Sequence, residues 1–161
     1  MRRRRVRPTR SGTFKLRLAD EERDLLRHLP GQLRELLQAD DPALERLFPD
    51  AYTDDDQAST EFSRLMKADL VAGRMGAIEV LEATIDLQEV DTEQLSAWLS
   101  VLNDLRLVIG TQLEVSEEMD EEDMLRSPEA HMFAMYYYLS ELEGEVIEAL
   151  ADGLDDAGTE I

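Results

Sequence analysis

The segment from about Thr92 to Leu113 constrains the fold most, because it is apolar over most of the circumference of the helix that it predicts. Asp91 and Gln94 are spaced as a capping box, which indicates where this helix begins. A helix with so wide an apolar surface lies in the middle of a fold, surrounded by other helices. The apolar residues are Leu95, Trp98, Leu99, Leu102, Leu105, Ile109 and Leu113, flanked by Val101, Leu107 and Val108.

Amphipathic segments on both sides of this central segment predict the helices that pack around it. Pro30-Gly31 falls inside the first of them and is expected to kink or break it. Gly153 is expected to cap the end of the last one. The sequence therefore predicts an all-α single domain of about five helices in a bundle-like or orthogonal arrangement. The expected helices cover residues 21–38, 42–48, 54–85, 92–113 and 128–152.

Both ends of the chain are expected to lie outside the helical domain of residues 13–153. Residues 1–12 combine charge of one sign with Pro8 and Gly12, which predicts a disordered arginine-rich tail. Residues 154–161 are small and acidic, which predicts a flexible tail. Phe14–Leu18 alternates apolar and polar residues, as a strand does. Because one short strand is not stable alone, we expect it to pair with a second chain or to lie extended across the helices.

The net charge of −20 conceals a division of the chain into a basic start and an acidic body. The first 17 residues hold eight basic residues and no acidic one, and the rest holds nine basic residues against 37 acidic ones, a net charge of −28. Such a body repels phosphate and attracts basic protein surfaces. Direct DNA binding by the folded domain is therefore not expected, and contact with DNA is assigned to the N-terminal tail alone.

The basic tail has two interpretations, and the sequence leaves both open. One is an arm that contacts nucleic acid phosphates. The other is a solubilising tail that folds back on the acidic body. No aromatic residue stands among the arginines, which removes base stacking as a source of affinity. The residues concerned are Arg2, Arg3, Arg4, Arg5, Arg7 and Arg10.

Polar residues interrupt the apolar surface of the central helix at Asn103, Asp104 and Arg106. Asn103 and Arg106 are three residues apart and share a face. We interpret the group as a hydrogen-bonded seam that fixes helix register, with a partner-binding patch as the alternative. Three adjacent tyrosines, residues 136–138, point in directions about 100° apart on a helix, so at least one is expected to be half exposed. Tyr137 is the preferred partner contact.

The sequence contains no recognisable catalytic or metal-binding pattern. There is no cysteine, and neither His28 nor His131 has a partner at metal-ligand spacing. No apolar stretch is long enough to span a bilayer, and the basic start lacks the apolar segment of a signal peptide behind it. We therefore expect a non-enzymatic cytoplasmic protein that needs no cofactor and binds no membrane.

Three segments in matching order resemble the AosR-like family of small helical actinobacterial proteins. They are Trp98–Leu113, Asp41–Tyr52 and the aromatic helix Met132–Leu150. The resemblance covers roughly Leu16 to Leu150. It implies control of transcription through a sigma factor or RNA polymerase, in the response to oxidative stress and in sulfur metabolism. The family's redox switch is a pair of cysteines three residues apart, and a cysteine-free chain cannot form that disulfide.

A second class of function also fits the sequence, namely a structural or adaptor protein without a direct transcriptional role. In this case the Phe14–Leu18 strand would pair with its twin in a homodimer, and an adaptor for proteolysis is one version. The two classes differ in their partner, since neither needs an active site.

Overall fold

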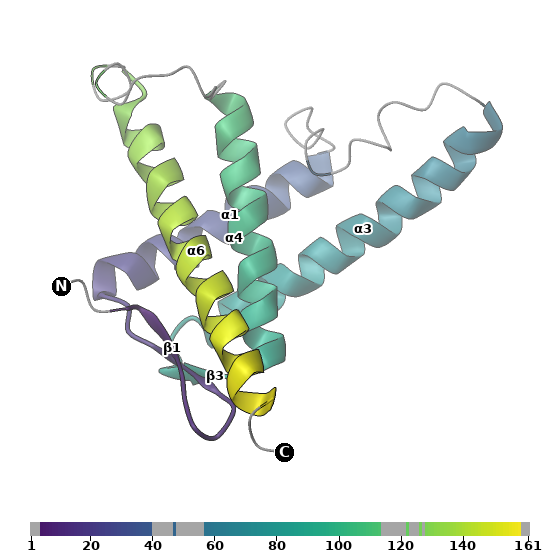
Figure 1. Ribbon diagram of the computed structural model, residues 1–161. Helices are drawn as coiled ribbons and strands as arrows, with labels where there is room; N and C mark the ends of the chain where they lie inside the picture. Colours follow the sequence, from purple (N-terminus) through teal and green to yellow (C-terminus); the bar gives the residue numbers. More distant parts are fainter. Residues whose placement is uncertain are drawn as a thin grey trace.

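The computed structural model describes residues 4–39, 47, 57–113, 122, 126 and 128–158. Within these residues the fold is mostly helical, which confirms the coarse prediction, and a small three-stranded sheet is added to it (Figure 1). The short helix expected at residues 42–48 lies outside the described residues, apart from Leu47. The elements are β1 (Val6–Pro8), β2 (Phe14–Leu16), α1 (Asp20–Ala39), α3 (Gln57–Thr84), β3 (Glu89–Val90), α4 (Thr92–Gln112) and α6 (Ala130–Gly158).

Helix α4 is the centre of the fold, as its wide apolar surface predicts. It lies beside α6 and packs against α3 and α1 (Figure 1). Its start is fixed by the predicted capping box: the Gln94 backbone N–H donates to Asp91 Oδ1 at 2.8 Å, and the Asp91 N–H donates to Gln94 Oε1 at 2.9 Å. These bonds satisfy two N–H groups that the helix end would otherwise leave unpaired.

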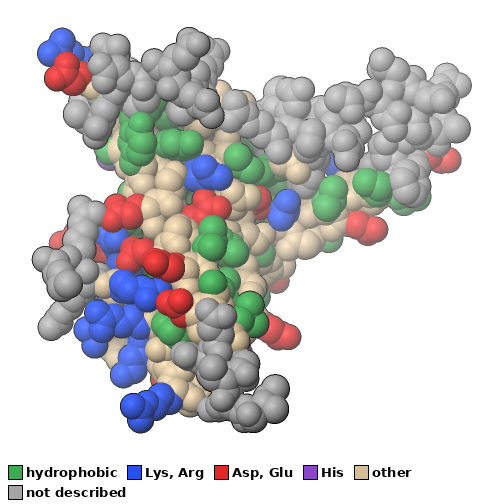
Figure 2. Space-filling model, viewed as in Figure 1, with side chains coloured by type: hydrophobic (Ala, Val, Ile, Leu, Met, Phe, Trp, Pro, Cys, Tyr) green, Lys and Arg blue, Asp and Glu red, His purple; other side chains and the backbone are tan. Residues whose placement is uncertain are grey.

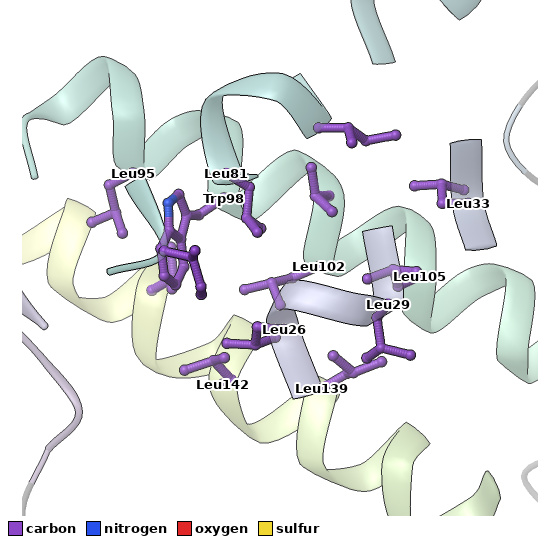
Figure 3. Packing of buried hydrophobic residues seen from close by; sticks show 14 of the residues in the cluster. Leu26, Leu29, Leu33, Leu81, Leu95, Trp98, Leu102, Leu105, Leu139 and Leu142 are labelled. Carbon is purple, nitrogen blue, oxygen red and sulfur yellow. The ribbon is translucent and has the colours of Figure 1, made fainter. Parts of the chain in front are cut away.

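The hydrophobic core lies where the four helices meet (Figure 3). Trp98 is fully buried there, and its indole Nε1 donates a hydrogen bond to Thr84 Oγ1 at 2.7 Å. This bond links α4 to the end of α3. Further fully buried side chains come from every described helix: Leu26, Leu33, Ile78, Leu81, Leu95, Leu102, Leu139 and Leu142.

Helix α1 continues through Pro30, so of the predicted kink or break the break does not occur. Proline removes one intrahelical hydrogen bond and normally kinks a helix. Here Leu26, Leu29 and Leu33 are buried on both sides of Pro30 and hold the two halves of the helix against the core. Tertiary packing thus overrides the local signal.

The N-terminal segment differs from the predicted disordered tail, because residues 6–16 form an antiparallel hairpin. Val6 pairs with Leu16 and Pro8 with Phe14, and the turn contains Gly12 with a φ of 86°, which glycine adopts without strain. On its other edge β2 pairs with β3, Phe14 opposite Val90. Since β2 is the central strand of the order β1-β2-β3, it cannot pair with a twin in a homodimer.

Helix α6 extends to Gly158, so Gly153 is an interior residue of the helix rather than its cap, and residues 154–158 are helical rather than a flexible tail. A Cβ at Gly153 would lie 3.0 Å from Cζ and 3.2 Å from Cε1 of the buried Phe14. Glycine is therefore what lets the hairpin approach α6 closely.

A Gly153→Val substitution is expected to lower the free energy of unfolding by about 2 kcal/mol, because the added side chain displaces the Phe14 ring. Gly144→Ala on the same helix is the matched control. A Cβ there meets nothing within 4 Å, so this variant should gain about 0.5–1 kcal/mol from helix propensity. Urea unfolding followed by circular dichroism measures both. Equal effects of the two substitutions would contradict the close contact between Gly153 and Phe14.

Candidate functional site

The amino-terminal half of α3 projects away from the other three helices (Figure 1). Its carboxyl-terminal half is anchored in the core by Ile78 and Leu81. The projecting half instead exposes Leu65, Met66 and Leu70, and Leu65 is 67% exposed. Large exposed apolar side chains that lie together on one element are typical of a protein-binding surface.

An acidic stretch begins in the anchored half of α3 and ends in the first turn of α4. Residues 75–93 contain six acidic residues and no basic one, and all six are exposed: Glu79, Glu82, Asp86, Glu89, Asp91 and Glu93. Two of them pair with α1, Glu82 with Arg34 and Asp86 with Arg27. The stretch remains strongly negative, so a partner that docks along α3 is favoured if its surface is basic.

The polar residues predicted on α4 lie in a network, the polar seam, formed by Arg74, Asn103, Asp104, Arg106 and Glu143. Arg106 Nη2 donates to Asn103 Oδ1 at 3.1 Å, and its Nε lies 2.7 Å from Glu143 Oε2 on α6. Arg74 Nε of α3 lies 3.2 Å from Asp104 Oδ2. The polar seam therefore joins α4 to both of its main neighbours, and this geometry supports the interpretation that it fixes helix register.

Asp104 is the most perturbed carboxyl group of the polar seam. It is only 1% exposed, and burial raises its pKa from 3.8 to about 6. The positive charge of Arg74 opposes this rise, and the negative charge of Glu143 adds to it. A carboxylate in this position binds two helices together and is inaccessible to a partner, so Asp104 does not belong to the exposed surface.

Tyr137 meets the expectation of one half-exposed tyrosine, since it is 45% exposed. Its ring stands edge-on to that of Tyr136, with the centroids 5.6 Å apart. Tyr138 is half-buried instead and lies under Arg5, whose guanidinium carbon is 5.5 Å from the centre of the ring. Of the partner contacts predicted from the sequence, Tyr137 is the one that the fold leaves most open to solvent.

The predicted arginine tail is divided by the fold. Arg4 and Arg5 fold back on the acidic body, as one of the two interpretations expected. Arg5 Nη1 donates to Glu145 Oε2 at 2.7 Å, Arg5 Nε donates to Glu22, and Arg4 Nη1 donates to Asp152 Oδ2 at 3.1 Å. Arg7 and Arg10 remain exposed, and Arg2 and Arg3 lie outside the described residues. Figure 2 shows this mixed cluster of basic and acidic side chains at the lower left, over the hairpin and α6.

An Arg5→Ala substitution is expected to cost about 2 kcal/mol of stability, because it leaves Glu22 and Glu145 facing each other in a mostly buried position. Burial opposes ionisation of Glu22, but hydrogen bonds from the Ala19 backbone and from Arg5 outweigh it and hold the pKa of Glu22 below its ordinary 4.5. The stability that Glu22 contributes is therefore present above pH 4.5 and is lost as the pH falls through the lower folded-state pKa.

The exposed Arg7 on the same hairpin is the matched control for Arg5, and Arg7→Ala should change stability by less than about 0.5 kcal/mol. Urea unfolding at neutral and acidic pH measures both variants. A cost for Arg5→Ala that does not shrink in acid would contradict the pairing with Glu22.

The described residues hold no other arrangement with an evident chemical role. Within them no three His, Cys, Asp or Glu side chains are grouped to hold a metal ion. None of the described helices has both the length and the apolar character needed to cross a membrane. The exposed face of α3, which sequence reasoning missed, is thus the main candidate surface. Phe62, Leu65, Met66 and Leu70 recur at helical spacing, but this pattern alone does not distinguish a buried stripe from an exposed one.

Comparison with known proteins identifies relatives along nearly the whole chain. A protein of Mycobacterium leprae (strain TN) that carries the AosR name is 26% identical over 91% of this chain and 86% of its own length. The oxidative stress regulators AosR of Mycobacterium bovis (strain ATCC BAA-935 / AF2122/97) and Mycobacterium tuberculosis (strain ATCC 25618 / H37Rv) are each 30% identical over 68% of this chain. That match spans 58% of the length of the latter two proteins.

No solved structure is significantly similar to this fold. The family model described as "Domain of unknown function (DUF2017)" matches residues 1–150, which include the hairpin, α3, α4 and most of α6. The chain therefore belongs to the DUF2017 family, and its similarity to proteins named AosR confirms the resemblance seen in its sequence.

Proposed function

We propose that this protein is a cytoplasmic, non-enzymatic regulator that controls transcription by binding a sigma factor or RNA polymerase in the response to oxidative stress. The exposed apolar face of α3, formed by Leu65, Met66 and Leu70, is the observation that carries the proposal. The relatives named as oxidative stress regulators supply the class of process.

The charge distribution supports a partner of this kind. Surfaces that contact DNA, such as those of sigma factors, are basic because they must neutralise phosphates. The body of this protein has the opposite sign, and its acidic stretch of residues 75–93 begins in the anchored half of α3. Complementary charge would speed association and orient the partner, while the apolar side chains of α3 would supply affinity at the centre of the contact.

Binding to purified actinobacterial RNA polymerase and to its stress-responsive sigma factors tests the proposal. The triple variant Leu65→Ser/Met66→Ser/Leu70→Ser is expected to lose more than about tenfold in affinity, because the central apolar contacts of an interface carry most of its binding energy. The triple variant Leu87→Ser/Ile147→Ser/Leu154→Ser is the matched control, since it removes three exposed apolar side chains elsewhere. Its affinity should equal that of the wild type.

Failure of the wild type to bind either polymerase or sigma factor would reject the regulatory proposal. The alternative, a structural or adaptor protein, would then be favoured, and sedimentation would test for a homodimer. Equal loss in both triple variants would move the binding surface away from α3. Circular dichroism on each variant excludes unfolding as the cause.

The absence of cysteine yields a separate prediction about the signal. An intramolecular disulfide cannot form in this chain, so a low dose of peroxide is expected to leave helix content and partner affinity unchanged, apart from methionine oxidation. Affinity measured before and after peroxide treatment checks this. A reversible gain of affinity at low dose would contradict it.

A further inference from the structure

The outward face of the β1–β2 hairpin carries cations that have no partner within the described part of the chain. Arg7 lies directly opposite Lys15 in the sheet register. The Arg17 backbone N–H donates to the Arg5 carbonyl at 2.6 Å, which places Arg17 opposite Arg5. The side chains of Arg7, Arg10, Lys15 and Arg17 are all exposed. These four residues are called the cation ladder below.

The opposite face of the same hairpin is buried and fixed. Val6, Phe14 and Leu16 point from that face into the core. Arg5, at the start of β1, lies on the same face as Arg17 and Arg7, but its side chain is paired with Glu22 of α1 and Glu145 of α6, and Arg4 is paired with Asp152 of α6. The hairpin therefore divides its basic residues into two groups. Arg4 and Arg5 hold it on the body, and the cation ladder faces solvent on a rigid support.

The arrangement of the cation ladder is unfavourable for folding alone. Like charges directly opposite each other on neighbouring strands destabilise a sheet, and Arg7 faces Lys15. Residues 4–18 contain no acid, although the chain has 37. The nearest one in the sheet is Glu89, opposite Lys15 on β3, which accepts a hydrogen bond from the Thr13 hydroxyl. A ligand that brings negative charge would relieve the repulsion.

We infer that the cation ladder binds the phosphate backbone of duplex DNA. Side chains on one face of a strand recur about every 6.8 Å, which is twice the rise of 3.4 Å per phosphate along one DNA strand. The outward face offers Thr9 and Thr13 beside the cations and no aromatic side chain on which unpaired bases would stack. This favours duplex over single-stranded nucleic acid.

The acidic body determines how the DNA would be approached. Its charge repels phosphates everywhere except at the hairpin, so the duplex contacts only the outward face of the hairpin, and binding is weak and independent of sequence. The surface differs from the arm predicted from the sequence, because Arg4 and Arg5 are occupied while Lys15 and Arg17 join Arg7 and Arg10. The inference does not depend on the identity of the protein partner that α3 binds.

Fluorescence anisotropy with a labelled duplex of mixed sequence tests the inference on the full chain. Four phosphate contacts predict that the logarithm of the binding constant falls with the logarithm of salt concentration with a slope of about −3.6. The variant Arg7→Gln/Lys15→Gln/Arg17→Gln keeps Arg10 alone and should show a slope of about −0.9. At about 50 mM salt it should bind more than about tenfold more weakly than the wild type.

The control variant is Arg27→Gln/Arg64→Gln/Arg126→Gln, which removes the same charge from exposed positions outside the hairpin. It should retain the slope of the wild type. The inference is overturned if the wild type does not bind the duplex at about 50 mM salt, or if both triple variants lose the same affinity.

Circular dichroism should show that the hairpin variant keeps the helix content of the wild type. This variant should also still bind the polymerase or sigma factor through α3. Loss of duplex binding alone in the hairpin variant would therefore leave the proposed function intact. Loss of partner binding alone in the α3 variant would leave the inference that the cation ladder binds DNA intact.

Discussion

An Asp104→Asn variant is expected to gain about 2 kcal/mol of stability relative to the wild type as the pH rises from about 4 to about 7. Burial raises the folded-state pKa of Asp104 to about 6, above its ordinary value of 3.8. The folded protein therefore holds this proton more tightly than the unfolded chain does. The stabilisation that the neutral carboxyl provides is complete below pH 3.8 and is lost as the pH rises through 6, whereas asparagine does not titrate.

Urea unfolding of both proteins at several pH values between about 4 and 7 measures this difference. Asp69→Asn is the matched control, because it makes the same substitution at an exposed position on α3. A stability difference between Asp104→Asn and the wild type that stays constant across this range would contradict the raised pKa.

The second large effect is expected at Trp98. The substitution Trp98→Ala should lower the free energy of unfolding by about 4 kcal/mol. Trp98 has no exposed surface, and its removal leaves a cavity between α4 and the end of α3 that rigid neighbours fill only in part (Figure 3). The substitution also removes the donor of the 2.7 Å hydrogen bond to Thr84. Circular dichroism during urea unfolding measures the loss, since tryptophan fluorescence disappears with the only tryptophan.

Two control variants separate the contributions at Trp98. Trp98→Phe keeps most of the apolar volume and loses the hydrogen bond, so it should cost only about 1–2 kcal/mol. Leu65→Ala on the projecting half of α3 should be nearly neutral, because Leu65 is exposed. A cost below about 1 kcal/mol for Trp98→Ala would show that the core collapses around the cavity.

Asp104 and Trp98, both on α4, hold helix α3 in place. The Arg74–Asp104 contact fixes the middle of α3 to α4, and the Trp98–Thr84 hydrogen bond fixes its end. The projecting half of α3 therefore starts from a firmly held support. A partner that binds Leu65 and Leu70 would meet a surface already oriented, which reduces the entropy lost on association.

The features that the sequence determined by itself are local or depend on one continuous face. The capping box at Asp91 and Gln94 involves residues three apart, so its bonds form wherever that helix begins. The apolar circumference of α4 is likewise set by spacing along the chain, and it placed this helix in the centre. Membership of the family was also evident from the sequence, because the order of its matching segments is a property of the chain.

The candidate surfaces were decided by tertiary structure, because their character depends on residues distant in the chain. The arginines of the N-terminal segment repel one another in isolation, which is why disorder was predicted. In the fold, Arg5 meets Glu145 140 residues away and Arg4 meets Asp152 148 residues away, and these pairs support an ordered hairpin. In the same way, the helical spacing of Leu65, Met66 and Leu70 gave no indication that the other helices pack only on the far half of α3. Periodicity defines a face of a helix, but only the neighbours that the fold supplies decide whether that face is buried or left for a partner.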